Sequence, residues 1–81
     1  METLCEVTIL AFGQIAEDLD TREKIIKLQT GTTIQQLVEE LGQGHWLGQG
    51  LAVAVNGEKV DVDFRIIDSC EIALLPPVSG G

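Results

Sequence analysis

The alternation of apolar and polar residues marks two strands at the opposite ends of the sequence. Residues 5–12 (CEVTILAF) and 70–75 (CEIALL) are β-rich and carry apolar side chains at both odd and even positions. Apolar side chains on both faces are typical of a strand that is covered on both sides. We therefore expect these two strands to be central in a sheet and buried on both faces.

The clearest helix is predicted just before the middle of the chain. An apolar stripe with the spacing i, i+3, i+4 and i+7 is formed by Ile34, Leu37, Val38 and Leu41. Thr32 or Thr33 can cap its start, since each is followed three residues later by a glutamine. Gly42 stands where a left-handed residue would end the helix. A shorter helical segment is predicted over residues 14–20, with Ile15, Ala16 and Leu19 directed inward.

Three further strands complete the predicted elements. Residues 23–28 alternate between apolar and charged side chains, and the lysines in this segment are typical of an edge strand. Residues 51–55 are followed by Asn56-Gly57, a strong hairpin signal, and residues 58–60 form the short return strand. Residues 65–69 are expected to turn the chain.

The order of these elements favours an α+β fold. Two hairpins joined by a helix that crosses one face bring the first and last strands together as parallel neighbours. This is the ubiquitin-like β-grasp arrangement, a mixed sheet with one main helix on one face. Cys5 and Cys70 would then begin their strands at the same end of the sheet. We interpret them as reduced thiols, and a disulfide between them stays open.

Length and charge narrow the class of protein. Eighty-one residues with 44% hydrophobic content allow one domain with a modest core. We expect a cytoplasmic protein, because no apolar run could span a membrane and the first residues lack a signal-peptide pattern. The net charge of −8 argues against nucleic acid as a partner and favours a basic protein surface.

Two segments resemble binding motifs, but a simpler interpretation suits them better. The glycine-rich residues 42–50 (GQGHWLGQG) lack a P-loop pattern, so a surface loop anchored by Trp46 and Leu47 is favoured. His45 has no partner in the sequence and is expected to be exposed. Asp61 and Asp63 are interpreted as solvated turn acids, since the further ligands of a calcium loop are missing. No metal site is predicted.

The final residues, LLPPVSGG, carry the candidate chemistry. Pro76 cannot donate to a sheet, so we expect a β-grasp domain over residues 1–75 and an extended tail over residues 76–81. Six residues reach roughly 20 Å, far enough to enter a partner protein. Gly80 and Gly81 make the tip thin and leave the α-carboxylate as its functional group. A carboxylate needs activation, most simply as an acyl-adenylate, and the chain shows no ATP site of its own.

The sequence resembles the small, sulfur-carrier subunit of molybdopterin synthase, the MoaD family. The resemblance is carried by PPVSGG, by DSCEIA at residues 68–73, by VNG at residues 55–57 with Val60, by the capped helix and by VTILAF at residues 7–12. It covers nearly the whole chain, and the terminal hexapeptide is its most specific part. The segment after the first strand departs from the family, because Gly13-Gln14 stands where an Arg-Glu pair is common.

The resemblance implies a carrier rather than an enzyme acting alone. An E1-like partner would use ATP and magnesium to adenylate Gly81, and a sulfur donor would convert it to a thiocarboxylate. The tail would then enter the large subunit of a heterotetrameric molybdopterin synthase and deliver sulfur to cyclic pyranopterin monophosphate. Gly80 would give access to Gly81, while the rest of the tail and the residue before it would contact the partners: Leu75, Pro76, Pro77, Val78 and Ser79. No cofactor is expected to be bound to this chain itself.

Three other functions stay open on the sequence. The sulfur carrier of thiazole synthesis shares the fold and the diglycine but generally lacks PPVSGG. A ubiquitin-like modifier would form an isopeptide at Gly81 instead of a thiocarboxylate. A β-grasp interaction module with an inert tail would keep its function after deletion of Gly81.

Overall fold

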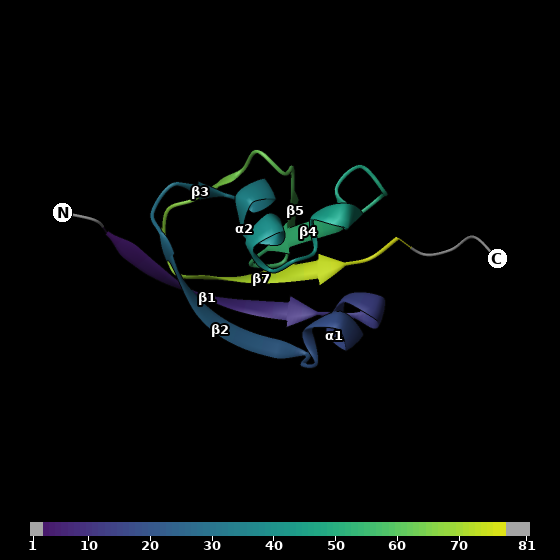
Figure 1. Ribbon diagram of the computed structural model, residues 1–81. Helices are drawn as coiled ribbons and strands as arrows, with labels where there is room; N and C mark the ends of the chain where they lie inside the picture. Colours follow the sequence, from purple (N-terminus) through teal and green to yellow (C-terminus); the bar gives the residue numbers. More distant parts are fainter. Residues whose placement is uncertain (1–2, 78–81) are drawn as a thin grey trace.

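The computed structural model describes residues 3–77 and has the predicted β-grasp architecture (Figure 1). Its main sheet has the strand order β2-β1-β7-β4-β5. The central strands are β1 (Leu4–Ala11) and β7 (Cys70–Leu75). They run parallel, and Val7 is aligned with Cys70 and Ala11 with Leu74. The parallel central pair predicted from the sequence is therefore confirmed.

The remaining strands of the main sheet are antiparallel to their neighbours. The strand β2 (Glu23–Gln29) pairs with β1 and forms one edge of the sheet, as its lysines predicted. The strand β4 (Ala52–Val55) pairs with β7, and β5 (Glu58–Val60) closes the other edge. Asn56 and Gly57 have φ values of +50° and +85°, the left-handed pair that a tight hairpin turn requires.

The helix α2 (Ile34–Glu40) packs on one face of the sheet and has both predicted caps. The Thr33 hydroxyl accepts a 3.1 Å hydrogen bond from the Gln36 amide, and the Thr33 amide donates to the Gln36 side chain at 2.9 Å. At the other end, Gly42 has a φ of +77°. The amides of Gly42 and Gln43 donate to the carbonyls of Glu39 and Val38, which is a Schellman motif.

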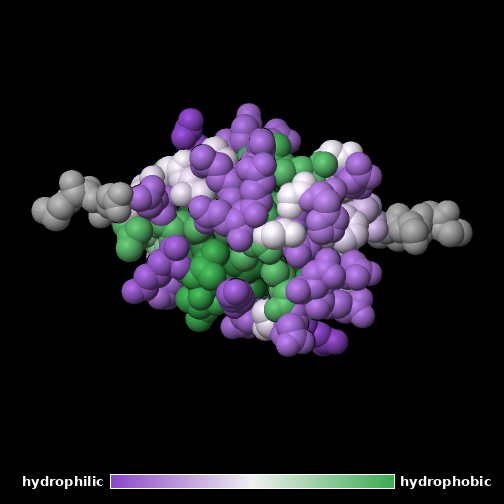
Figure 2. Space-filling view, viewed as in Figure 1, coloured by the Kyte–Doolittle hydropathy of each residue, from purple (hydrophilic) through white to green (hydrophobic). Residues whose placement is uncertain are grey.

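The core lies between α2, the sheet and the short helix α1 (Gly13–Leu19). As predicted, Ile15 of α1 is fully buried, and Ala16 and Leu19 pack against the core. The contribution of α2 to the core is Ile34, Leu37 and Val38. Near the edge strand the cover is incomplete: Ile26 is only partly buried, and Figure 2 shows a hydrophobic area over β1 and β2.

The expectation that the central strands are buried on both faces is wrong. Only one face of β1 is covered, since Val7 and Ile9 are buried whereas Leu4 and Glu6 are exposed. In β7, Ile72 and Leu74 are buried on the covered face while Leu75 is exposed on the other. The apolar residues that suggested a second buried face therefore line an open face of the sheet.

A second, small sheet was not predicted. The strand β6 (Arg65–Ile66) lies where only a turn was expected and pairs with β3 (Thr32–Thr33). The segment before β6 also accepts hydrogen bonds from the first amides of α2, because the Ile34 amide donates to the Phe64 carbonyl at 3.0 Å and the Gln35 amide to the Val62 carbonyl at 2.8 Å. The segment that leads into β6 thus satisfies donors at the start of α2.

Candidate functional site

The tail begins where β7 leaves the sheet, at the end to which both central strands point in Figure 1. Leu75 is the last residue of β7, and Pro76 and Pro77 follow without secondary structure. The Pro76 ring is partly buried and Pro77 is exposed. Since proline has no amide hydrogen, the ladder between β7 and β4 cannot continue past Leu75.

Two glycines approach the prolines closely. A Cβ atom built on Gly13, at the start of α1, would lie 3.1 Å from Cγ of Pro76. A Cβ atom built on Gly50, in the loop before β4, would lie 3.1 Å from Cβ of Pro77. Both glycines have positive φ, +55° and +90°. The root of the tail therefore lies close to the backbone of two segments, the start of α1 and the loop before β4.

The open face of the sheet lies next to this root. The strand registers place Leu10, Ala73 and Ala54 in one row across β1, β7 and β4, with Leu75 beside Ala52 in the next row. On the same face, Glu6 lies opposite Lys27 in the strand register, and Thr8 lies opposite Ile25 on one side and Glu71 on the other. The arrangement is a small apolar strip with charged residues of both signs around it, which suits a protein–protein contact.

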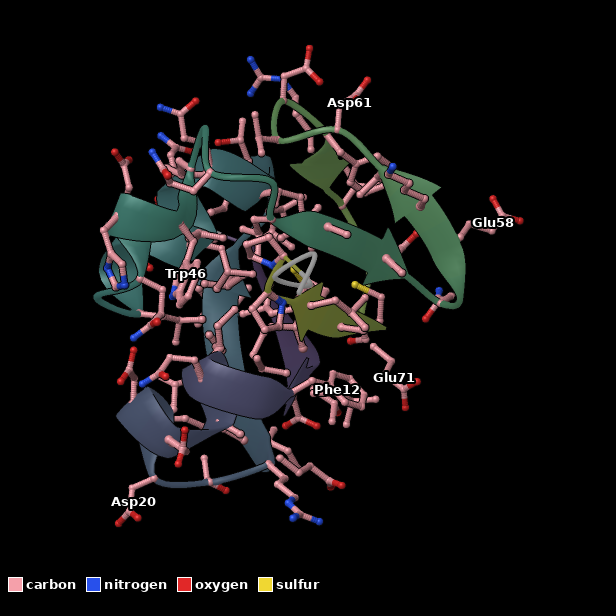
Figure 3. All side chains as sticks on the ribbon, turned by 90° about the vertical axis from the view of Figure 1, so that its right-hand side faces the viewer. Phe12, Asp20, Trp46, Glu58, Asp61 and Glu71 are labelled. Carbon is pink, nitrogen blue, oxygen red and sulfur yellow. The ribbon has the colours of Figure 1, made fainter. Side chains whose placement is uncertain are left out.

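Phe12 extends this apolar surface and was not singled out by the sequence analysis as a contact residue. It follows β1 directly and is 46% exposed. Figure 3 looks onto the tail end of the molecule and shows Phe12 and Glu71 on one side of β7, with Trp46 on the other. The signal in the sequence was Phe12 standing before Gly13, which lets α1 turn away and leaves the aromatic ring uncovered.

The expected site residues are only partly described by the structure. Leu75 is 37% exposed on the open face, and Pro76 and Pro77 form the root of the tail. Val78, Ser79, Gly80 and Gly81 lie outside the described residues. Sequence reasoning missed Gly13 and Gly50 as neighbours of the prolines, because no local pattern links residues so far apart in the chain.

The glycine-rich loop is anchored to the core as predicted. It contains a short 3₁₀ helix, η1 (Gly44–Trp46), and both Trp46 and Leu47 pack against the core. The indole Nε1 of Trp46 donates a 2.9 Å hydrogen bond to Oε1 of Gln43, whose side chain is buried. His45 is exposed, as expected, with its ring 5.1 Å from that of Trp46. Within residues 3–77, no group of three or more potential metal ligands comes together.

The two cysteines are free thiols. Cys5 is buried and Cys70 partly buried, both on the covered face of the sheet. Cys70 is aligned with Val7 rather than with Cys5, so the two are offset by two residues along neighbouring strands. Burial raises the pKa of the Cys70 thiol above its ordinary value, with smaller contributions in the same direction from Cys5 and Asp68.

Within the part of the chain that the structure describes, no helix has the length and apolar character needed to span a membrane. The helices of the described residues are two short α-helices and one 3₁₀ helix.

The sequence and the fold both match known proteins. The profile of the ThiS family matches residues 9–81. No curated protein matches the sequence significantly. A chain from the complex of subunits 1 and 2 of molybdopterin-converting factor from Helicobacter pylori 26695 is 31% identical, with a TM-score of 0.60, covering 94% of this chain and 99% of that one.

Two more distant structures share the fold. The putative molybdopterin converting factor subunit 1 from Pyrococcus furiosus is 23% identical with a TM-score of 0.73, covering 91% of this chain and 99% of that one. The small archaeal modifier protein 1 from Methanosarcina acetivorans is 22% identical with a TM-score of 0.69, covering 98% of this chain and 99% of that one. Both are similar along nearly their entire length.

Proposed function

The chain belongs to the ThiS family, and on this basis we propose that it is a sulfur carrier whose Gly81 is converted to a thiocarboxylate. The observation that carries the proposal is the path of β7. This central strand ends at Leu75 and passes into Pro76 and Pro77, which lead out of the sheet beside its open face. The family profile continues from this strand to Gly81.

The proposed chemistry begins with activation of the Gly81 carboxylate. A carboxylate oxygen attacks the α-phosphorus of ATP, with magnesium on the phosphates, and pyrophosphate leaves. A sulfide equivalent from a sulfur donor then attacks the acyl carbon, and AMP leaves with the bonding electrons. The product is a thiocarboxylate, a stronger nucleophile than the carboxylate it replaces. Both steps belong to an E1-like partner, so this chain is not an enzyme by itself.

We assign the sulfur to molybdopterin synthesis, with this chain as the small subunit of molybdopterin synthase. The assignment is supported by the 31% identical chain, which comes from a complex of subunits 1 and 2 of molybdopterin-converting factor. In the assembled heterotetramer the large subunit would receive the tail, and the thiocarboxylate sulfur would pass to cyclic pyranopterin monophosphate. Water would then attack the acyl carbon of Gly81, and the acyl–sulfur bond would break with its electrons on the sulfur, which stays on the pterin. The Gly81 carboxylate is restored, so the carrier can be charged again.

A reconstitution tests this assignment. The purified chain is incubated with the E1-like enzyme, ATP, magnesium and a sulfur donor, and then with the large subunit and cyclic pyranopterin monophosphate. Formation of molybdopterin is the expected result, and a variant lacking Gly81 should form none. If the charged chain delivers no sulfur to the pyranopterin although the large subunit is active with another carrier, the pathway assignment is wrong.

The same reconstitution can distinguish the proposed function from two related ones. Transfer of sulfur to a thiazole synthase instead of the pyranopterin would indicate a role in thiamine synthesis. The match to the ThiS family is the reason to test this alternative. An isopeptide between Gly81 and a lysine would indicate a modifier, as the similarity to small archaeal modifier protein 1 suggests. The masses of a thiocarboxylate and an isopeptide conjugate distinguish these products.

A further inference from the structure

The glycines with positive φ fall into two groups. Gly31, Gly42, Gly48 and Gly57 have no heavy atom within 4 Å of a built Cβ atom, so only their backbone conformation favours glycine. Gly13 and Gly50 share that conformation, but there a Cβ atom would also meet a proline ring at 3.1 Å. These two positions therefore need glycine for two separate reasons.

The two contacts have a common target. Gly13 is held by α1, which packs its buried Ile15 into the core, and Gly50 belongs to the loop that Trp46 and Leu47 anchor. The start of α1 approaches the ring of Pro76, and the loop approaches the ring of Pro77. Because both rings rest on backbone anchored to the core, the two prolines are supported from two sides rather than from β7 alone.

We propose that Gly13 and Gly50 are positioning residues that form a seat for Pro76 and Pro77 and so fix the direction in which the tail leaves the domain. The consequence for sulfur loading rests on the proposed carrier function. A tail whose first two residues are already fixed loses less conformational entropy when it enters the channel of an activating partner. The seat should therefore lower the concentration of carrier that the partner needs, with less effect on the chemical step.

The chain itself supplies matched controls. Gly13→Ala and Gly50→Ala place a methyl group against a proline ring, whereas Gly42→Ala and Gly48→Ala place the same group in open space at φ values of +77° and +79°. All four variants carry the backbone cost of an L-residue at positive φ. A difference between the two pairs therefore reports the contact with the prolines, and circular dichroism confirms that each variant is folded.

The first readout needs only the full-length chain. Proton NMR of the wild type should show nuclear Overhauser effects between the Gly13 α-protons and the Pro76 ring, and between the Gly50 α-protons and the Pro77 ring. Each seat variant should shift the ring resonances of its own proline, while both control variants leave them in place. Absence of the wild-type effects would overturn the seat, independently of what the protein does.

The second readout measures adenylation by the E1-like enzyme at increasing carrier concentration. The proposal predicts that Gly13→Ala and Gly50→Ala raise KM about tenfold with a smaller change in kcat, and that the two controls keep the wild-type KM. Equal KM values for seat and control variants would overturn the positioning role. If the wild type is not adenylated at all, the carrier function fails, and the NMR readout alone decides whether the seat exists.

Discussion

At the scale of single residues, Cys70 gives the clearest prediction. Burial of its thiol, aided by Cys5 and Asp68, raises its pKa above the value of 9.0 that the thiol has in the unfolded chain. Below 9.0 both states keep the proton, so the thiol leaves the free energy of unfolding unchanged. As pH rises above 9.0, the unfolded thiol ionises while the folded one keeps its proton, so the free energy of unfolding falls. Urea unfolding from neutral to alkaline pH measures the fall.

The variant Cys70→Ala isolates this effect. It lacks the thiol, so its free energy of unfolding should decrease less than that of the wild type as pH rises above 9.0. All other side chains are shared by the two proteins, so the comparison isolates the Cys70 thiol. Parallel pH profiles for the two proteins would show that burial of Cys70 does not perturb its ionisation.

At the scale of the element, the capping box of α2 should be measurable. Thr33→Ala removes the hydroxyl that accepts from the Gln36 amide and should lower the free energy of unfolding by about 1 kcal/mol. Thr30→Ala is the control, because the Thr30 side chain is exposed and lies outside the cap; it should change stability by less than about 0.5 kcal/mol. Equal losses in chemical denaturation would mean that the capping box does not stabilise α2.

The elements with strong local signals were the ones that could be predicted. The apolar stripe, the Thr33 cap and Asn56-Gly57 each act within a few residues, so sequence alone located α2 and the β4–β5 hairpin. The pairing of β3 with β6 has no such signal, because two-residue strands carry no periodicity and depend on contacts that the fold creates. The exposed face of β1 was predicted to be buried, because the sequence alone does not distinguish an apolar residue in a core from one on a contact surface.

At the scale of the whole molecule, the open face and the tail root lie together at one end of the sheet. Leu75 belongs to both, and placing a charge there should weaken binding to the large subunit that we propose as the partner. We expect Leu75→Glu to raise the Kd about tenfold or more, because a desolvated charge would replace an apolar contact. Calorimetric titration of the folded variant with the large subunit measures the change.

Ile67→Glu provides the comparison. Ile67 is also an exposed apolar residue, 64% accessible, but it precedes β7 whereas Leu75 ends it. The Ile67→Glu variant should bind the large subunit with the Kd of the wild type. If both variants weaken binding equally, the contact is not localised to the tail end of the open face.

The recognition drawn from the sequence is confirmed at the level of the family and the fold. The ThiS profile matches residues 9–81, and the chain shares its fold with a putative molybdopterin converting factor subunit 1 and a small archaeal modifier protein 1. The contacts of Pro76 with Gly13 and of Pro77 with Gly50 could not be predicted. They join residues that are distant in sequence. They also depend on glycines, which have no side chain and so add nothing to a pattern of apolar and polar residues.

The central claim is that Gly81 carries sulfur, and the most direct measurement is the intact mass of the protein purified from its native cell under gentle reduction. The account predicts a fraction heavier by the replacement of one oxygen with sulfur, and fragmentation should place the change at Gly81. A single unmodified mass that also persists after incubation with E1-like enzyme, ATP and a sulfur donor would contradict it, and the tail would then be a binding element.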